Sequence, residues 1–356
     1  MTTDEPPRRI IDPDAIPSID NPVFAPTYDG TPEDQMIVVD PNRLPGFPSR
    51  PPRAYPVAYL DFHEIVNDTF ADIPVAVTWC PLCGSAAVYD RREAVDGEPL
   101  ALEFGVSGKL AADNLVLYDR ETDSEWKQTT GECLSGPLQG HSLARLSGSV
   151  MSFDAFETVY PDGVILQPPG GRSEAAGVGD EPEPIDYSTE PYGDYAETDG
   201  FGLSAHRGTG TREWRIESVA PKDPVFGIEV AGIPVGFPVA AVARQGGVVT
   251  TTVGDQSVVV FETDTGVRAF DNPGFRWRKT AAGFRAESVD DGSADDQTPS
   301  AALYDGATGE PVDAPAAHTG EAGGAAAEPL EPIPGVHSFA FAWIDDHGRD
   351  SMYETT

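Results

Sequence analysis

The amino-acid sequence predicts a mainly β fold with short helices, an α+β chain built from two tandem, pseudo-symmetric β-rich units. Short apolar and β-branched segments recur along the chain, and clusters of Gly, Pro, Asp and Asn separate them. Only residues 59–66 and 153–159 are predicted as helices, and both are short. The same motifs also return in the same order in the second half of the chain.

The first half of the chain carries the clearest strands. Residues Val75–Trp79 are apolar and β-branched, and they lead directly into Cys80. Gly, Asp and Asn residues separate this strand from the following ones. Further strands are predicted at 86–91, 100–106 and 115–119. We therefore expect Cys80 to stand at the end of a strand.

Local composition divides the chain into four parts. Residues 1–20 are polar and Pro-rich, which predicts a flexible N-terminal tail. Residues 166–220 are rich in Gly, Glu and Pro, which predicts an acidic linker or long surface loop. Between and after these segments we expect a first β-rich unit at 21–165 and a second, degenerate unit at 221–356.

An internal repeat supports the two-unit architecture. Four motifs match in order: Ala54–Ala58 with Gly236–Ala240, Val75–Trp79 with Val258–Glu262, Leu117–Thr122 with Leu303–Thr308, and Gly131–Glu132 with Gly320–Glu321. The alternative is coincidental similarity between strands and turns. The second copy reads Glu262-Thr-Asp-Thr-Gly where the first has its cysteines. Any chemistry therefore belongs to the first half.

The charge balance is strongly acidic, with 59 Asp and Glu against 23 Lys and Arg and a formal net charge of −36. Binding to nucleic acid or to an anionic membrane surface is not expected from such a surface. Many carboxylates with few lysines suit concentrated salt, so we interpret the composition as salt-adapted and haloarchaeal in character. Disorder is the alternative, but 39% hydrophobic residues with 16 Phe, 11 Tyr and 5 Trp argue against it.

Two features that the sequence lacks bear on where the protein is located in the cell. No apolar run approaches the roughly 20 residues that a membrane-spanning helix needs, so no membrane insertion is expected. The first residues contain no apolar stretch after their charges, and we expect a cytoplasmic protein. Three cysteines in a long chain do not form a disulfide framework.

The motif Cys80-Pro-Leu-Cys83-Gly is typical of a metal-binding turn. Its spacing places two sulfur atoms on one side of a tight turn, and zinc or copper would suit thiolate ligands. His63 lies shortly before the strand that leads to the cysteines and is the preferred third ligand. Cys133 and His141 are the other candidates. The first hypothesis is therefore a metal-binding protein whose open coordination position could meet a small-molecule substrate.

Two other functions fit the same cysteines. A Trp-Cys-x-x-Cys segment after a strand also suits a thiol–disulfide oxidoreductase, with Cys80 as nucleophile and Cys83 as resolving residue. A strand rather than a helix is predicted after the motif, which favours the metal-binding turn. In the third reading the cysteines are structural and the chain is a non-catalytic binding or scaffold module. All three remain open at this point.

A second group of polar residues could line a pocket or could lock a turn through internal hydrogen bonds and ion pairs. These residues are Ser107, Asn114, Asp119, Arg120, Trp126 and Gln128. Nearby, Gly108-Lys109 invites comparison with a phosphate-binding loop, but Leu110 follows where Ser or Thr is needed. No nucleotide cofactor is therefore expected.

Several motifs together resemble domain-of-unknown-function family 3179, DUF3179. They are Ile16–Asp20, Ala54–Val57, His63–Asp68, Val77–Ala86, Phe104–Leu110, Leu115–Arg120, Thr122–Gln128, Gly136–Gly140 and Phe339–Trp343. The resemblance spans about residues 15–345 and assigns no activity. It implies that His63, Cys80 and Cys83 belong to one recurrent pattern. Cys133 stands where the family pattern leads us to expect a small residue, which weakens it as a ligand.

Overall fold

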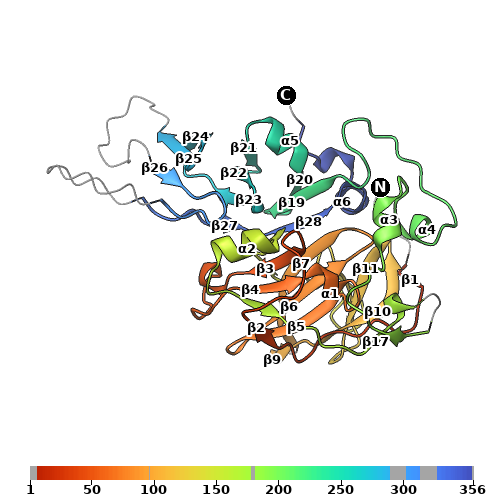
Figure 1. Cartoon of the computed structure of the whole chain (residues 1–356). Helices are drawn as coiled ribbons and strands as arrows, with labels where there is room; N and C mark the ends of the chain where they lie inside the picture. Colours follow the sequence, from red (N-terminus) through yellow and green to blue (C-terminus); the bar gives the residue numbers. More distant parts are fainter. Residues whose placement is uncertain (1–5, 96, 178–180, 289–301, 313–326, 355–356) are drawn as a thin grey trace.

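The computed structural model describes residues 6–95, 97–177, 181–288, 302–312 and 327–354. The fold is mainly β with short helices, as the sequence predicts. In Figure 1 the strands of the first half form the lower body and those of the second half form the upper body. Strands β19 and β28 lie where the two bodies meet.

The elements of the first half are short and closely spaced. They are β1 (Arg8–Arg9), β2 (Phe24–Ala25), β3 (Gln35–Val39), η1 (Pro41–Arg43), β4 (Arg53–Pro56), α1 (Val57–Leu60), β5 (Ile65–Phe70), β6 (Ile73–Cys80), β7 (Ser85–Asp90), β8 (Arg92–Val95), β9 (Glu98–Ala101), β10 (Phe104–Ala111), β11 (Asn114–Asp119), β12 (Glu125–Lys127), β13 (Cys133–Ser135), β14 (Arg145–Leu146), β15 (Ser149–Ser152), α2 (Phe153–Val159) and β16 (Val164–Leu166).

The remaining elements are equally short, with the longest helix near the C-terminus. They are β17 (Arg172–Ser173), η2 (Glu174–Ala176), β18 (Glu183–Pro184), α3 (Gly193–Glu197), α4 (Leu203–His206), β19 (Pro224–Val230), β20 (Ile233–Pro238), α5 (Val239–Arg244), β21 (Val248–Val253), β22 (Gln256–Thr263), β23 (Gly266–Asp271), β24 (Phe275–Thr280), β25 (Gly283–Ser288), β26 (Ala302–Tyr304), β27 (Pro332–Ile333), β28 (Gly335–Phe339), α6 (Ala340–His347) and η3 (Arg349–Ser351). None of these helices is long and apolar enough to cross a membrane.

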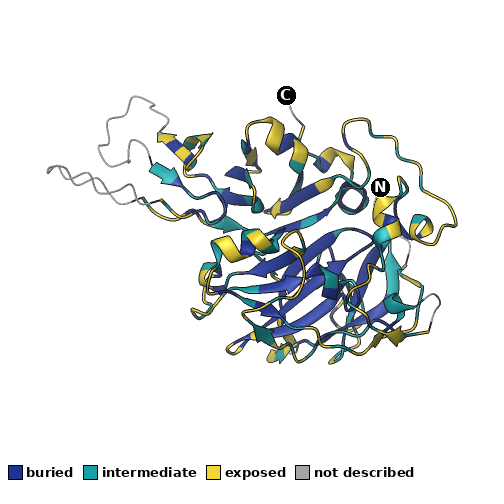
Figure 2. Cartoon of the chain, in the orientation of Figure 1, coloured by how far each residue is buried: buried dark blue, intermediate teal, exposed yellow. Residues whose placement is uncertain are grey.

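One sheet joins the two halves of the chain. Its strands run in the order β20-β19-β28-β7-β6-β5, and β28 meets β7 where His337 lies opposite Ala86. Every residue of β6 and β7 is buried, because the two strands have neighbours on both edges and packed layers on both faces. Figure 2 shows these strands in dark blue in the centre of the molecule. The cysteine motif therefore connects two of the most buried strands.

The neighbouring sheet β1-β10-β11-β12-β13 covers the cysteine motif from one side. A two-residue loop connects β10 to β11, and Ala112 and Asp113 both have positive φ, at 50° and 66°. Such loops match the right-handed twist of antiparallel strands. This hairpin places the carbonyl oxygen of Asp113 beside Cys83.

Elements that carry matching sequence motifs have matching local geometry. Pro56 precedes α1 with φ −58° and ψ 126°, and Pro238 precedes α5 with φ −59° and ψ 123°. Strands β6 and β22 are each the middle strand of an antiparallel three-stranded meander. The fourth motif of the second half, Gly320–Glu321, lies outside the described residues.

The predicted N-terminal tail is packed rather than loose from residue 8 onward. Arg8 and Arg9 pair with β10, and Ile16 and Ile19 are each 4% exposed. Residues 1–5 lie outside the described part. A few apolar side chains among many polar ones do not raise the local hydropathy, yet each fills a place in the core. The tail prediction is therefore corrected for residues 8–20.

The predicted linker also contributes to the core. It contains α3 and α4, and Tyr195, Phe201 and Leu203 are buried in the same apolar cluster as the two cysteines of the motif. Residues 178–180 lie outside the described part.

The predicted helix at 59–66 is shorter than expected, because β5 begins at Ile65 and pairs with β6. The helix predicted at 153–159 is confirmed as α2.

Candidate functional site

The cysteine motif forms a tight turn between β6 and β7. Cys80 ends β6 opposite Ser85, and the backbone N–H of Cys83 donates to the carbonyl oxygen of Cys80 at 3.1 Å. Gly84 has φ +53°, and a Cβ there would lie 2.7 Å from the ring of Phe339. Only glycine meets both conditions without strain. Both cysteines are buried free thiols.

The surroundings of Cys80 favour its thiolate. Burial by itself raises the pKa of Cys80, but hydrogen bonds from the Cys83 thiol and from the backbone N–H groups of Cys83, Leu115 and Leu82 outweigh it. The pKa of Cys80 is therefore lowered. These donors come from the turn itself and from β11, so the sheet that covers the motif supplies one of the hydrogen-bond donors to the Cys80 sulfur.

Cys83 has the opposite character. Burial raises its pKa, and its hydrogen bond to the Cys80 sulfur raises the pKa further, to well above the usual value. Its Sγ also lies 3.2 Å from the carbonyl oxygen of Asp113, which is an alternative acceptor for the single S–H proton. The pair is therefore asymmetric, because the pKa of Cys80 is lowered and the pKa of Cys83 is raised.

A buried carboxyl group lies next to this pair. Glu64 is 7% exposed, and its Oε2 has no hydrogen-bond partner within the described residues. Burial and the neighbouring Cys80 thiolate raise the pKa of Glu64 well above its usual value. Its backbone has φ +57°, an uncommon conformation for a residue with a side chain. The N–H of Trp79 donates to the Glu64 carbonyl oxygen at 2.8 Å, which holds Glu64 beside the end of β6.

Two cavities flank the turn. The smaller has a volume of about 90 Å³ and is lined by Glu64, Leu82 and Leu115 among others. The larger, of about 510 Å³, touches the turn at Pro81 and Gly84. Leu82 and Leu115, whose backbone N–H groups help to lower the pKa of Cys80, also line the smaller cavity.

The larger cavity also contains an ionisable group. Asp61 lines it, and Trp79 Nε1 donates to Asp61 Oδ1 at 2.8 Å. Burial raises the pKa of Asp61 to about 7 in spite of this hydrogen bond. Tyr192 lines both cavities and separates them.

Segments from distant parts of the sequence hold the turn in place. The hydroxyl of Tyr195 donates to the carbonyl oxygen of Leu82 at 2.7 Å and accepts from the Gly202 N–H at 3.0 Å. The N–H of Phe339 donates to the carbonyl oxygen of Cys83 at 2.7 Å. The site therefore depends on the segment after residue 166 and on β28 of the second half.

His63 does not join the cysteines in a ligand set. Its Nδ1 lies 2.8 Å from the Pro17 carbonyl oxygen, and its Nε2 lies 2.7 Å from the Tyr187 hydroxyl. Both ring nitrogens are therefore engaged, and burial lowers the pKa of His63. In the part of the chain that the structure describes, no group of three or more His, Cys, Asp or Glu side chains is arranged to hold a metal ion.

The two other candidate ligands, Cys133 and His141, have contacts of their own outside the cysteine turn. The Cys133 thiol donates to the Ser135 carbonyl oxygen at 3.4 Å, and burial raises its pKa. His141 is exposed, with its Nδ1 3.3 Å from Glu93 Oε2. Neither completes a metal site with the turn, so the predicted zinc or copper centre has no geometric support among the described residues.

The six predicted pocket residues border neither cavity beside the turn. Asp119 accepts hydrogen bonds from the Thr122 N–H at 2.6 Å and from Trp126 Nε1 at 2.9 Å, which locks the turn after β11. Arg120 pairs with Asp20 at 3.0 Å. These groups form a network within the fold, which matches the turn-locking alternative.

The other three residues of this group also serve the fold. Gln128 accepts from the Ser85 hydroxyl at 2.7 Å and donates to Thr78 Oγ1 at 3.0 Å, so it braces β6 against β7 just below the cysteine turn. The Ser107 hydroxyl donates to a backbone carbonyl of β11 at 2.5 Å. Asn114 Nδ2 donates to a carboxylate of α6.

Sequence reasoning did not identify Glu64, Asp61, Tyr192 or Tyr195. Glu64 directly follows the selected His63, so its place beside the motif was a usable signal. The two tyrosines lie in the segment interpreted as a linker, where two aromatic residues within four positions mark a packed segment.

Comparison with known proteins gives a family but no activity. No curated protein and no solved structure matches the chain significantly. A family model described as a protein of unknown function, DUF3179, matches residues 13–350. The matched range includes the cysteine turn, the larger cavity and every described strand except β1. The chain therefore belongs to the DUF3179 family.

Proposed function

We propose that this protein is a thiol–disulfide oxidoreductase in which Cys80 is the nucleophile and Cys83 is the resolving residue. The observation that carries the proposal is the asymmetry of the pair: four hydrogen-bond donors favour the Cys80 thiolate, while the pKa of Cys83 is raised. A thiolate is the attacking species in disulfide exchange. A cytoplasmic location, in which thiols are kept reduced, is part of this proposal.

The proposed reaction transfers two electrons. The Cys80 thiolate attacks one sulfur of a disulfide substrate, forms a mixed disulfide and releases the other sulfur as a thiolate. Cys83 then loses its proton and attacks Cys80, which forms the Cys80–Cys83 disulfide and releases the second substrate sulfur. Two electrons and two protons pass from the dithiol to the substrate, which leaves as two thiols. A separate reductant must then restore the dithiol.

The neighbouring groups suit the two proton transfers. Glu64 lies next to Cys80 and has a raised pKa, so its carboxyl can take the proton from one thiol and return it to the leaving thiolate. The larger cavity touches Pro81 and Gly84, and its volume of about 510 Å³ suits a small-molecule disulfide. We propose that the substrate approaches the turn from this side, which requires the turn to shift, because Cys80 and Cys83 are buried and line neither cavity.

The metal-binding hypothesis takes second place. Cys80 and Cys83 alone could supply two thiolate ligands to zinc or copper. His63 would have to give up its contacts with Pro17 and Tyr187 to join them, at a cost of about 1 kcal/mol or more for each hydrogen bond. A non-catalytic module with structural cysteines is the third possibility, and it does not account for the donors that face Cys80.

A redox titration of the purified chain, combined with metal analysis, tests the proposed function. We expect oxidation to form one intramolecular disulfide between Cys80 and Cys83, with a midpoint potential between about −200 and −320 mV. Peptide mass mapping identifies the linked cysteines, and Cys133 serves as the internal control because it remains alkylatable after unfolding. One tightly bound metal ion per chain that protects both thiols, or an unchanged count of free thiols after oxidation, would contradict the proposal.

Replacing Glu64 by glutamine is expected to separate thiolate formation from turnover. The variant has no carboxylate to repel the Cys80 thiolate, so the alkylation pKa of Cys80 should fall. It also has no group to accept and return the proton, so the rate of disulfide reduction should fall by about 100-fold. Stopped-flow alkylation and turnover are measured over the same pH range. A parallel change in both quantities would indicate a structural role for Glu64 instead.

We also propose that the two units arose by internal duplication. Three of the four matched sequence motifs fall on elements of the same type, and Pro56 and Pro238 have nearly the same backbone angles. The second unit carries no cysteines at the equivalent turn after β22. Under this proposal, the second unit retained the matching strands and lost the two cysteines.

A further inference from the structure

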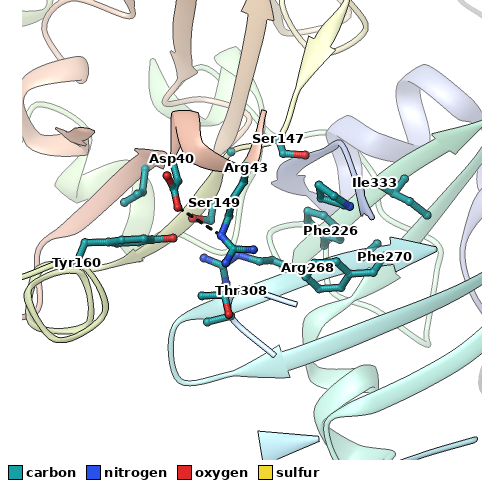
Figure 3. A pocket seen from close by; sticks show the side chains of 15 residues that line it. Asp40, Arg43, Ser147, Ser149, Tyr160, Phe226, Arg268, Phe270, Thr308 and Ile333 are labelled. Carbon is teal, nitrogen blue, oxygen red and sulfur yellow. Dashed lines mark ion pairs between the residues drawn. The ribbon is translucent and has the colours of Figure 1, made fainter. Parts of the chain in front are cut away.

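A separate small cavity lies between the two units, away from the cysteine turn. Its volume is about 40 Å³, and residues of both units line it. Arg43 from η1 and Arg268 from β23 meet there, as Figure 3 shows. Tyr160, which follows α2, lies on the same side of the cavity as Asp40. Two guanidinium groups therefore line one partly open cavity.

Each arginine has an unused hydrogen-bond donor in this interior. Arg268 Nη1 donates to the Thr265 carbonyl oxygen at 3.2 Å, but its Nη2 is buried and has no partner among the described residues. Arg43 Nε lies 3.3 Å from Asp40 Oδ2, yet it is also buried without a hydrogen bond in the described part. A buried donor without a partner is costly, so two of them at one cavity call for a ligand.

The charges around the cavity leave Arg268 undercompensated. Burial lowers the pKa of Arg268, and the neighbouring positive charge of Arg43 adds to this effect, against the opposing influence of Tyr160, Asp305 and Asp40. Asp40, which also lines the cavity, and Asp305 each have a partner other than Arg268. Asp40 pairs with Arg43, and Asp305 caps the loop after β26 by accepting from the N–H groups of Ala307 and Thr308 at 2.7 and 3.1 Å.

We propose that this cavity binds one small oxyanion, such as phosphate, sulfate or a carboxylate group, between Arg43 and Arg268. The anion would accept hydrogen bonds from the two unused donors and would screen the repulsion between the guanidinium groups. Hydroxyl side chains from Ser147, Ser149 and Thr308 also line the space. A water molecule needs about 10–15 Å³ on the same measure, so the cavity accepts an anion of a few heavy atoms and excludes a nucleotide.

Binding at this place would join the two units. Arg43 belongs to the first unit and Arg268 to the second, so one anion would cross-link them through charge-assisted hydrogen bonds. The inference is independent of the thiol chemistry, because none of the residues that line this cavity lines either cavity beside the cysteine turn.

Equilibrium dialysis with radiolabelled inorganic phosphate, at constant KCl concentration, tests the proposal. The wild-type chain is expected to bind one phosphate per chain with saturation. Arg268→Met should weaken the binding at least about 10-fold, the effect of losing a charge-assisted contact. Arg278→Met is the matched control, because Arg278 on β24 has a side chain that is 64% exposed and, among the described residues, forms an ion pair only with Glu287. Its binding should equal that of the wild type.

Competition identifies the kind of oxyanion. Displacement of phosphate by sulfate but not by acetate assigns a tetrahedral anion, and displacement by acetate as well assigns a carboxylate group. The proposal would be overturned if phosphate binding by the wild type did not saturate, or if Arg268→Met bound phosphate as tightly as the wild type. It would also be overturned if Arg278→Met lost as much affinity as Arg268→Met, or if added chloride displaced phosphate as well as sulfate does.

A second variant covers the case in which Arg268→Met does not fold. Arg268→Lys keeps the charge but removes the planar donor fork. Saturating phosphate should raise the Tm of the wild type by about 3 °C or more and should raise that of Arg268→Lys by less than half as much. Equal Tm increases in the two proteins would count against the site.

Discussion

Replacement of Cys83 by serine is expected to trap a covalent mixed disulfide on Cys80, and replacement of Cys80 is expected to abolish exchange. In Cys83→Ser the Cys80 thiolate can still attack a disulfide, but nothing resolves the product. In Cys80→Ser the nucleophile is lost, and the rate should fall by about 1,000-fold or more. Intact-mass measurement after incubation with glutathione disulfide checks this: one added glutathione is expected on Cys83→Ser and none on Cys80→Ser.

The control for this experiment is Cys133→Ser. Burial raises the pKa of Cys133, and it takes no part in the proposed pair, so this variant should exchange at the wild-type rate. Both serine variants at the turn are expected to fold, because serine is similar in size and its hydroxyl at position 83 can keep the hydrogen bond to the Asp113 carbonyl. Glutathione attached to Cys133, or equal losses in all three variants, would refute the assignment of Cys80 as the nucleophile.

Replacement of Asp346 by alanine is expected to destabilise the protein by about 3–5 kcal/mol, the usual cost of leaving one partner of a buried ion pair unpaired. Asp346 on α6 has a side chain only 1% exposed and forms an ion pair with Lys127 of β12. It also accepts from the Thr129 hydroxyl and from Asn114 Nδ2, the latter at 3.1 Å. The loss would leave Lys127 charged in the interior and would remove a link between β12 of the first half of the chain and α6 of the second half.

Urea unfolding at constant KCl concentration measures this loss. Asp350→Ala is the control, because Asp350 is exposed in η3, and a change within about 0.5 kcal/mol is expected there. The double variant Asp346→Ala with Lys127→Met should recover much of the stability, since it removes the unpaired charge as well. Equal destabilisation by the single and double variants would show that the ion pair is not the cause.

Local patterns predicted the secondary structure where the residues of one segment follow the period of a single element. Val75–Trp79 lies within β6, and the predicted helix at 153–159 coincides with α2, where Ser152 caps the first turn through Ala155 N–H. The prediction failed where single apolar residues sit in polar surroundings. Ile16 and Tyr195 are examples, because each fills the core from a segment whose average composition is polar.

The sequence by itself determined that Cys80 and Cys83 lie in one tight turn at the end of a buried strand, since the two-residue spacing and Gly84 require that local geometry. Only the tertiary structure decided what surrounds the sulfur atoms. The Leu115 N–H comes from a hairpin more than 30 positions away, and His63 is held by Tyr187 instead of turning to the cysteines. Thiol ionisation depends on donors and burial within a few ångströms, and contacts between distant segments set both.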